Sequence, residues 1–337
     1  MAIHPEQWLK VTQEGLFCAP GGFHIDPLTP VSRALVTHGH SDHARADHVQ
    51  LFATAPTLAI MHSRYGETMA GSEQAVAYAE PFTAGDVKVT FFPAGHILGS
   101  AQILLEYGGY RVIVSGDYKR RRDPTCAPFE VRQCDVFITE ATFGLPVFHH
   151  PPDGTQIAKL LQSLSLNPER THLVGAYPLG KCQRVICLLR EAGYGETIYL
   201  HGAMIALCDL YARYGVELGK LAPVADRSKE EMQGKIVLAP PSALHERWSR
   251  RLADPVTAFA SGWMMIRARA RQKRVDLPLV ISDHADWDEL TETIKDVGAA
   301  EVWVTHGRED ALVYYAGRQG LIARPLELAG YDEEEDD

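Results

Sequence analysis

The stretch Thr37 to Ala44, T-H-G-H-S-D-H-A, constrains the chain more than any other. It follows Arg33 to Thr37, an apolar and β-branched run that predicts a buried strand. The first two histidines alternate in an extended segment, whereas the aspartate and the third histidine are adjacent. One tetrahedral ion could not readily use all four side chains, so the stretch predicts two neighbouring ions. The alternative is unrelated polar residues at a helix start, with the aspartate or the serine as cap. The candidate ligands are His38, His40, Asp42 and His43.

More metal-type side chains stand just beyond other predicted strands. These strands are predicted over Val87 to Phe92, Tyr110 to Ser115, Asp135 to Thr139, Leu279 to Ser282 and Glu301 to Thr305. The side chains that follow them are His96, Asp117, Glu140, His284 and His306. Their shared position beyond strand ends predicts a single site.

Asp26 ends a shorter strand, directly before Pro27. From there it could support a metal-binding histidine through a hydrogen bond. The alternative is a turn residue that bonds within its own loop.

The composition is that of a globular enzyme. Hydrophobic residues make up 46% and charged residues 23% of the 337 residues. No apolar run approaches the roughly 20 residues of a membrane span, and the start M-A-I-H-P-E-Q lacks the regions of a signal peptide. We therefore expect a cytoplasmic protein without membrane contact. Its six cysteines form no C-x-x-C pair, which predicts reduced thiols.

The sequence pattern changes between Thr155 and Pro278. Strand and helix patterns alternate there without a metal-type cluster, while candidate ligands lie on both sides. This predicts an α/β domain inserted into another domain. The expected ranges are 1–150 and 281–330 for the outer domain, 151–280 for the insert and 331–337 for an acidic, disordered tail. Within the outer domain, Ala55 to Gly71 is predicted to be a strand and a helix.

Histidines with carboxylates suit two divalent cations, zinc foremost, with manganese or iron also compatible. Asp117 is the candidate for reaching both. Two such ions generate a nucleophile at neutral pH and stabilise charge on a phosphoryl or acyl oxygen, which predicts hydrolysis. Phosphodiesters fit best, because a general acid must protonate the leaving alkoxide. His284 is the spare imidazole for that role, and Glu140 could orient it.

These motifs carry a family resemblance. H-G-H-S-D-H at 38–43, with His96, Asp117 and a late histidine, resembles the metallo-β-lactamase fold, an αββα sandwich with a two-metal site at one edge. T-E-A-T at 139–142, S-D-H-A at 282–285 and V-T-H-G at 304–307 resemble the extra motifs of the β-CASP nucleases, which carry an inserted nucleic-acid-clamping domain. The resemblance spans nearly the whole chain.

Position by position, the resemblance implies a role for each candidate. One metal would be bound by His38, His40 and His96, and the other by Asp42, His43 and His306. Asp117 would bridge them, and Asp26 would match the aspartate that supports the ligands. Glu140 and His284 would form the orienter and acid pair, and Asp42 counts among the catalytic residues as well as the ligands.

The substrate signals conflict. V-G-A-Y-P-L-G-K at 174–181 resembles a segment of the DNA 5′-exonucleases, and a helix that begins at Gly-Lys offers backbone N–H groups and a cation to a phosphate. An ordinary turn with a surface lysine is the alternative. His306 stands where DNA-acting members usually have valine and RNA-processing members have histidine. The run G-L-F-C-A-P-G-G-F-H-I-D-P resembles the bacterial DNA-ligase-associated exonucleases most. We therefore expect a DNA exonuclease in repair with a functional link to a DNA ligase, an RNA-processing nuclease being the alternative.

Basic residues are the candidate nucleic-acid contacts. The net charge is −10, which argues against nucleic-acid binding through bulk charge. The segment from His245 to Arg274, however, contains eight Lys or Arg and only two acidic residues. That run could line a groove, or it could be a solvated face. The candidates are Tyr177, Lys181, Lys119, Arg120, Arg267 and Arg269.

Overall fold

The computed structural model describes residues 2–225, 227–252, 254–326 and 328. The acidic segment 331–337, expected to be a tail, lies outside the described residues. The chain forms two compact units, one of Met1–His149 with His284–Asp337 and one of His150–Asp283. The second unit thus interrupts the first in sequence. Among the described residues, no helix is long and apolar enough to cross a membrane.

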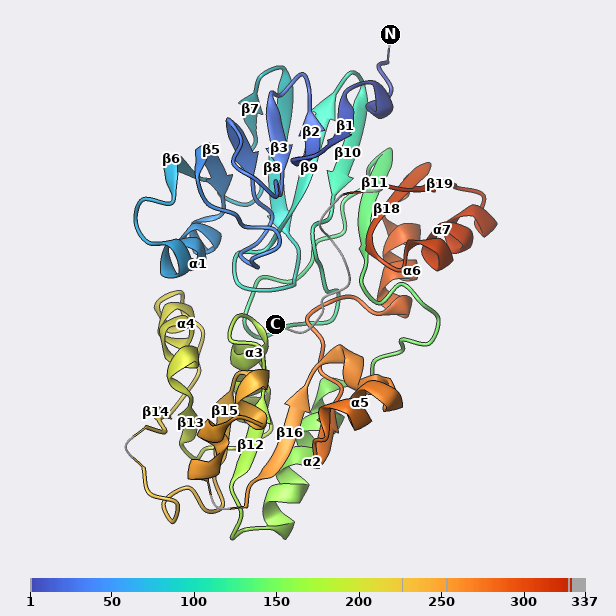
Figure 1. The fold of residues 1–337 in the computed structure, drawn as a ribbon. Coiled ribbons are helices and arrows are strands. Elements are labelled where there is room, and N and C mark those ends of the chain that lie inside the picture. Colours follow the sequence, from blue (N-terminus) through green and yellow to red (C-terminus); the bar gives the residue numbers. More distant parts are fainter. Residues whose placement is uncertain (1, 226, 253, 327, 329–337) are drawn as a thin grey trace. The chain divides into compact units, whose positions relative to one another are not determined.

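Two sheets form the centre of the first unit (Figure 1). The first runs in chain order: β1 (Leu9–Thr12), β2 (Gly15–Cys18), β3 (Phe23–Ile25), β4 (Arg33–Leu35), β5 (His48–Ala53) and β6 (Ala70–Ala75). The second has the order β19 (Ile322–Pro325), β18 (Glu301–Gly307), β11 (Val136–Ala141), β10 (Tyr110–Val114), β9 (Ala101–Tyr107), β8 (Val87–Pro93) and β7 (Phe82–Ala84).

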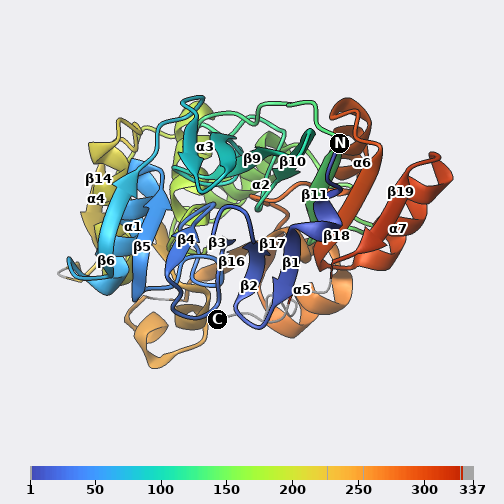
Figure 2. The ribbon, with the colours of Figure 1, turned by 90° about the horizontal axis from the view of Figure 1, so that it is seen from above.

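Helices cover the outer faces of these sheets. Figure 2 shows α1 (Ala55–Tyr65) beside β5, and α6 (Trp287–Asp296) and α7 (Glu309–Arg318) beside β18 and β19. One apolar core, which includes Phe23 and Val112, lies between the sheets. A second joins α6 and α7 to the outer face of β11 and β18, and a third joins α1 to β5. The layers are therefore αββα, the fold expected from the resemblance.

Strand direction brings the candidate ligands together. β8 and β10 both pair antiparallel with β9, while β10, β11 and β18 pair in parallel. These four strands therefore run in one direction, and their carboxyl ends share one edge of the second sheet. His96 and Asp117 follow β8 and β10, and His306 lies near the end of β18.

The second unit contains a parallel sheet. Its order is β14 (Leu221–Pro223), β13 (Ile198–Leu200), β15 (Ile236–Ala239), β12 (His172–Gly175), β16 (Val256–Ala260) and β17 (Leu277–Leu279). β12 and β15 are buried along their whole length, as is typical of parallel strands covered on both faces. The helices of this unit are α2 (Asp153–Leu166), α3 (Lys181–Glu191), α4 (Gly202–Arg213) and α5 (Arg267–Lys273).

Three local expectations differ from the structure. Ala55 to Gly71 contains no strand before its helix; α1 begins at Ala55 because Thr54 caps it, and the next strand begins at Ala70. Glu140 lies inside β11 rather than beyond it, at a register irregularity between Thr139 and Ala141. The strand expected over Leu279 to Ser282 is Leu277–Leu279, so an irregular segment leads to His284.

Candidate metal centre

The loop after β4 presents its imidazoles to the Asp117 carboxylate. Nε2 of His38 and Nε2 of His43 each lie 3.3 Å from Asp117 Oδ2. Nε2 of His96, from the loop after β8, lies 3.8 Å from the same oxygen and 2.9 Å from Nδ1 of His40. Two ligands of one tetrahedral zinc ion lie about 3.4 Å apart, given metal–ligand distances of about 2.1 Å. These separations therefore suit shared coordination.

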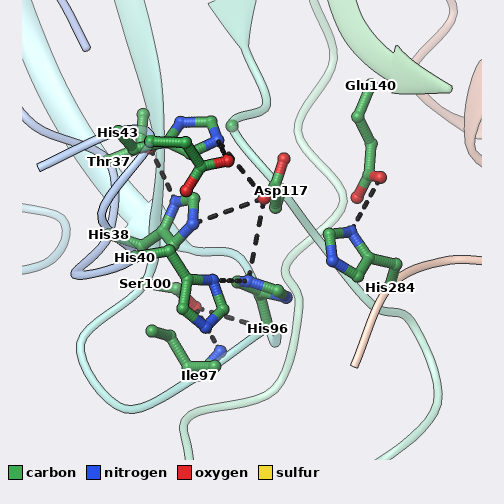
Figure 3. A network of polar contacts seen from close by, with 12 residues as sticks. Thr37, His38, His40, His43, His96, Ile97, Ser100, Asp117, Glu140 and His284 are labelled. Atoms are coloured by element: carbon green, nitrogen blue, oxygen red, sulfur yellow. Dashed lines mark hydrogen bonds and ion pairs between the residues drawn. The ribbon is translucent and has the colours of Figure 1, made fainter. Parts of the chain in front are cut away.

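The donor atoms fall into two sets. Those of His38, His40, His96 and Asp117 lie within 4.8 Å of one another, and so do those of Asp42, His43 and His306. The imidazoles of His43 and His306 stack, with centroids 4.8 Å apart. Because Asp117 Oδ2 belongs to the first set and is 3.3 Å from His43 of the second, this carboxylate lies beside both sets, and its role as a bridge stays a prediction (Figure 3).

Gly116 allows Asp117 to approach the histidine loop. Its φ is 55°, a left-handed conformation that favours glycine. A Cβ at this position would lie 2.8 Å from Cβ and Oγ1 of Thr37. Any other residue would push the Asp117 loop away from the segment that precedes His38.

Asp26 and Thr37 fix the orientation of two of the imidazoles. The Asp26 carboxylate accepts hydrogen bonds from the backbone N–H of Thr37 at 2.7 Å and from its hydroxyl at 2.6 Å. It also accepts from Nδ1 of His43 at 2.8 Å. Since the Thr37 hydroxyl donates to Asp26, it must accept from Nδ1 of His38, which is 3.0 Å away. Both rings thus carry their proton on Nδ1 and turn Nε2 toward Asp117.

Burial and neighbouring charges shift the pKa values of the buried cluster residues. Burial would raise the pKa of Asp117, but His43 and His38 hold it well below its usual range. Burial likewise opposes a charge on His43, yet Asp117 and Asp42 raise its pKa well above normal. Burial, together with neighbouring imidazoles, lowers the pKa of His96 well below its usual value. Asp117 and His96 are thus in the states that metal ligands need, an ionised carboxylate and a neutral imidazole, whereas His43 must lose a proton before it can bind a metal.

The residues therefore fit divalent ions. Nε2 of His38 and Oδ1 of Asp117 are buried and make no hydrogen bond within the part of the chain that the structure describes. Such buried atoms cost free energy unless a partner is supplied. A mixed imidazole and carboxylate set suits zinc and also manganese.

Glu140 and His284 form a pair beside this cluster. Oε2 of Glu140 lies 3.0 Å from Nδ1 of His284, and Oε1 accepts the backbone N–H of Tyr118 at 2.7 Å. Both side chains are buried. Figure 3 shows this pair on one side of Asp117, with the histidine cluster on the other.

The predicted contacts of the first unit are engaged within the protein. Lys119 is 1% exposed, and its Nζ lies 3.5 Å from the carbonyl oxygen of His284. The Arg120 guanidinium forms an ion pair with Asp296 of α6 at 2.8 Å. Their contact with nucleic acid stays a prediction.

The second unit holds the other four predicted contacts. Lys181 begins α3, is 4% exposed and forms an ion pair with Asp283. Tyr177 packs against the core of this unit. The arginines lie on α5, where Arg267 and Arg269 are two residues apart and so point to different faces; Arg269 covers the ring of Trp263 at 3.9 Å. The alternating arginines therefore do not form one stripe.

Several residues around the site were not anticipated from the sequence. Thr37 stands at the head of the histidine stretch, but nothing in the pattern indicated that its hydroxyl orients His38. Asp286 and Glu289 follow His284 as D-x-x-E, the pattern of a capping box that begins a helix. That pattern could have been recognised.

Replacing Thr37 with valine should weaken metal binding. Valine keeps the volume but removes the acceptor of His38 Nδ1 and one donor to Asp26. Loss of such a supporting hydrogen bond typically lowers metal affinity about 10-fold to 100-fold. Chelator competition measures this affinity, with Thr12→Val in β1, outside the cluster, as the control. Unchanged affinity would contradict the role of Thr37.

Comparison with known proteins gives three kinds of match: a family, a solved structure and curated relatives. Residues 25–175 match the family described as the metallo-beta-lactamase superfamily. A solved structure, of a protein of unknown function from Enterococcus faecalis V583, aligns with a TM-score of 0.61 at 13% identity, covering 89% of this chain and 80% of that one. This likeness concerns the fold alone.

Curated relatives have names from both DNA and RNA enzymology. A protein named "Probable DNA ligase" from Opitutus terrae is 30% identical over 320 residues, which are 94% of this chain and 31% of that protein. "Endoribonuclease ysh1" from Aspergillus fumigatus is 30% identical over 223 residues, 55% of this chain and 25% of that protein. The matched regions thus make up about a quarter to a third of these relatives' length.

Proposed function

Because this chain belongs to the metallo-β-lactamase superfamily and is homologous to its β-CASP nucleases, we propose that it is a two-metal hydrolase of nucleic-acid phosphodiesters. Its favoured substrate is single-stranded DNA, from which it removes nucleotides at one end. Of the two polarities, 5′ is weakly favoured. We place this activity in DNA repair. The observation that carries the proposal is the pair of donor sets meeting at Asp117, with the Glu140–His284 pair beside them.

Each group has a task in this hydrolysis. Two divalent ions held by the donor sets would supply a nucleophile at neutral pH and neutralise charge on the phosphoryl oxygens. Asp26 keeps His43 and, through Thr37, His38 in the tautomer that offers Nε2. His284 gives a proton to the leaving alkoxide oxygen, and Glu140 holds its Nδ1–H and stabilises the charged ring.

DNA is favoured by the relative named as a DNA ligase, which matches 94% of this chain. That match also supports a functional link to a ligase, since the matched region is about a third of a longer protein. RNA processing is the second candidate. It is favoured by His306, which stacks on His43 inside the second donor set, and by the similarity to an endoribonuclease.

Single-stranded DNA and RNA of matched sequence, labelled separately at each end, test the proposal. Incubation with the metal-loaded protein should release mononucleotides stepwise from one end of the DNA, and the label that appears first gives the polarity. Preferential internal cuts in RNA would replace the DNA proposal with the RNA-processing one. No cleavage of either polymer, with zinc or manganese, would contradict both.

A further inference from the structure

The loop that follows Asp117 is hydrogen-bonded to the segment that follows His284 and to helix α6. The backbone N–H of Ala285 donates to the carbonyl oxygen of Tyr118 at 2.7 Å. The N–H of the same Tyr118 donates to Glu140, the partner of His284. The residue next to the bridging carboxylate therefore contacts both strand β11 and the segment that carries His284.

Glu289 makes this connection with both of its carboxylate oxygens. Oε1 accepts the backbone N–H of Arg120 at 3.0 Å and that of Arg121 at 2.6 Å. Oε2 accepts the backbone N–H of Asp286 at 3.2 Å and lies 3.5 Å from Nε of Arg121. Glu289 is 5% exposed. A capping box needs only the bond to Asp286, so the two bonds to the arginine backbone are additional.

Asp286 strengthens the same junction. It is fully buried, it caps α6 by accepting the N–H of Glu289 at 3.1 Å, and it forms an ion pair with the Arg121 guanidinium. The basic run that follows Asp117 is thus engaged by acidic side chains of α6. Charge-assisted bonds of this kind are strong and directional.

We propose that Glu289 is a positioning residue, which acts by locking the loop that carries the His284 acid to the loop that carries the Asp117 bridge. This inference rests on the proposed function, because it assumes that His284 protonates the leaving group. Proton transfer requires that His284 lies within hydrogen-bond distance of one substrate oxygen, while the residues of the donor sets would hold the ions that bind the phosphoryl group. A small change in the distance between the two loops would therefore harm proton transfer before it harmed metal binding.

The choice of leaving group separates this role from a purely structural one. The alkoxide leaving group of DNA or RNA needs a proton, whereas the nitrophenolate of bis(p-nitrophenyl) phosphate departs without one. Glu289→Ala should lower kcat on nucleic acid about 10²-fold, because a misplacement of His284 by about 1 Å can have an effect of this size. KM and the amount of bound metal should not change. Hydrolysis of the nitrophenyl ester should fall less than about threefold, on the order of an ordinary surface change. Glu289→Gln keeps Oε1 for the two arginine N–H groups and should recover most of the turnover.

Asp288→Ala is the matched control. Asp288 also stands in the first turn of α6, but it is exposed and pairs with His149, and within the described part of the chain it forms no ion pair with Arg120 or Arg121. The substitution removes the same charge from the helix start but leaves the bonds from Glu289 to Arg120 and Arg121 in place. We therefore expect kcat on both substrates to stay at the wild-type level. Arg121→Met provides a second variant if Glu289→Ala folds poorly, because the Arg121 side chain is more exposed than that of Glu289. It should show the same preference for the nitrophenyl ester.

Hydrogen exchange of the metal-free protein tests the junction without activity. The amides of Arg120 and Arg121 should lose protection in Glu289→Ala and keep it in Asp288→Ala. Equal loss of turnover on both substrates, or exchange that matches the wild type, would overturn the positioning role. If the wild type cleaves the nitrophenyl ester but neither polymer, the proposed function fails together with the role that rests on it. The exchange result still decides whether Glu289 joins the two loops.

Discussion

Replacing Asp117 with alanine is expected to abolish two-metal binding and catalysis together. The carboxylate is buried, and Oδ2 lies 3.3 Å from imidazoles that belong to two different donor sets. Its removal deletes the carboxylate of the first set that also lies beside His43 of the second set. Two-metal stabilisation of a phosphoryl transition state provides several kcal/mol, so turnover should fall about 10³-fold or more.

Elemental analysis after reconstitution with zinc, together with turnover on the polymer that the wild type cleaves, checks this expectation. The matched control is Asp123→Asn, because Asp123 is also a buried aspartate of the first unit, bonded to the N–H and hydroxyl of Thr125. It should keep both metals. An Asp117→Ala protein that holds two ions and remains active would remove Asp117 as the bridge.

The position of a candidate ligand can be anticipated from the sequence wherever that residue follows a strand. β4, β8, β10 and β18 are apolar runs with an obvious period, so the amino-acid pattern alone places His38, His96, Asp117 and His306 at strand ends. A buried strand and the side chain beyond it are both local signals. The αββα layers also follow from the motif resemblance.

What could not be anticipated depends on contacts distant in sequence. Glu140 is expected beyond its strand, but β11 continues to Ala141, with a register irregularity at Glu140. Its carboxylate lies 3.0 Å from His284, 144 residues away. Lys119 and Arg120 are candidate phosphate contacts because their charge is visible in the sequence. The carboxylates of Asp286, Glu289 and Asp296 that engage Arg120 and Arg121 lie about 165 to 176 residues further along, as their numbers show. Sequence shows a charge but not its partner.

The same limit applies to Lys181. A Gly-Lys pair at a helix start predicts phosphate binding, and the helix does begin at Lys181. Its ammonium, however, is buried in an ion pair with Asp283. A buried, paired lysine must exchange a strong partner for a phosphate, so its role in substrate binding stays a prediction.

Replacing His284 with alanine should separate catalysis from metal binding. Loss of a general acid typically costs about 10²-fold to 10⁴-fold in turnover, and KM and both metals should be retained. The test distinguishes two roles for His284, because donor atoms of Asp117, Glu140 and His284 also lie close enough together to hold an ion. A variant that loses metal would make His284 a ligand instead.

The dependence of His284 on Glu140 can be measured in the same experiment. Glu140 holds Nδ1 of His284 at 3.0 Å, so Glu140→Gln should lower turnover less than His284→Ala, and the double variant should be no slower than His284→Ala alone. Added imidazole should restore part of the turnover of His284→Ala while Glu140 is present to orient it. Independent, multiplying losses would show that Glu140 acts on the metals or the substrate rather than through the imidazole.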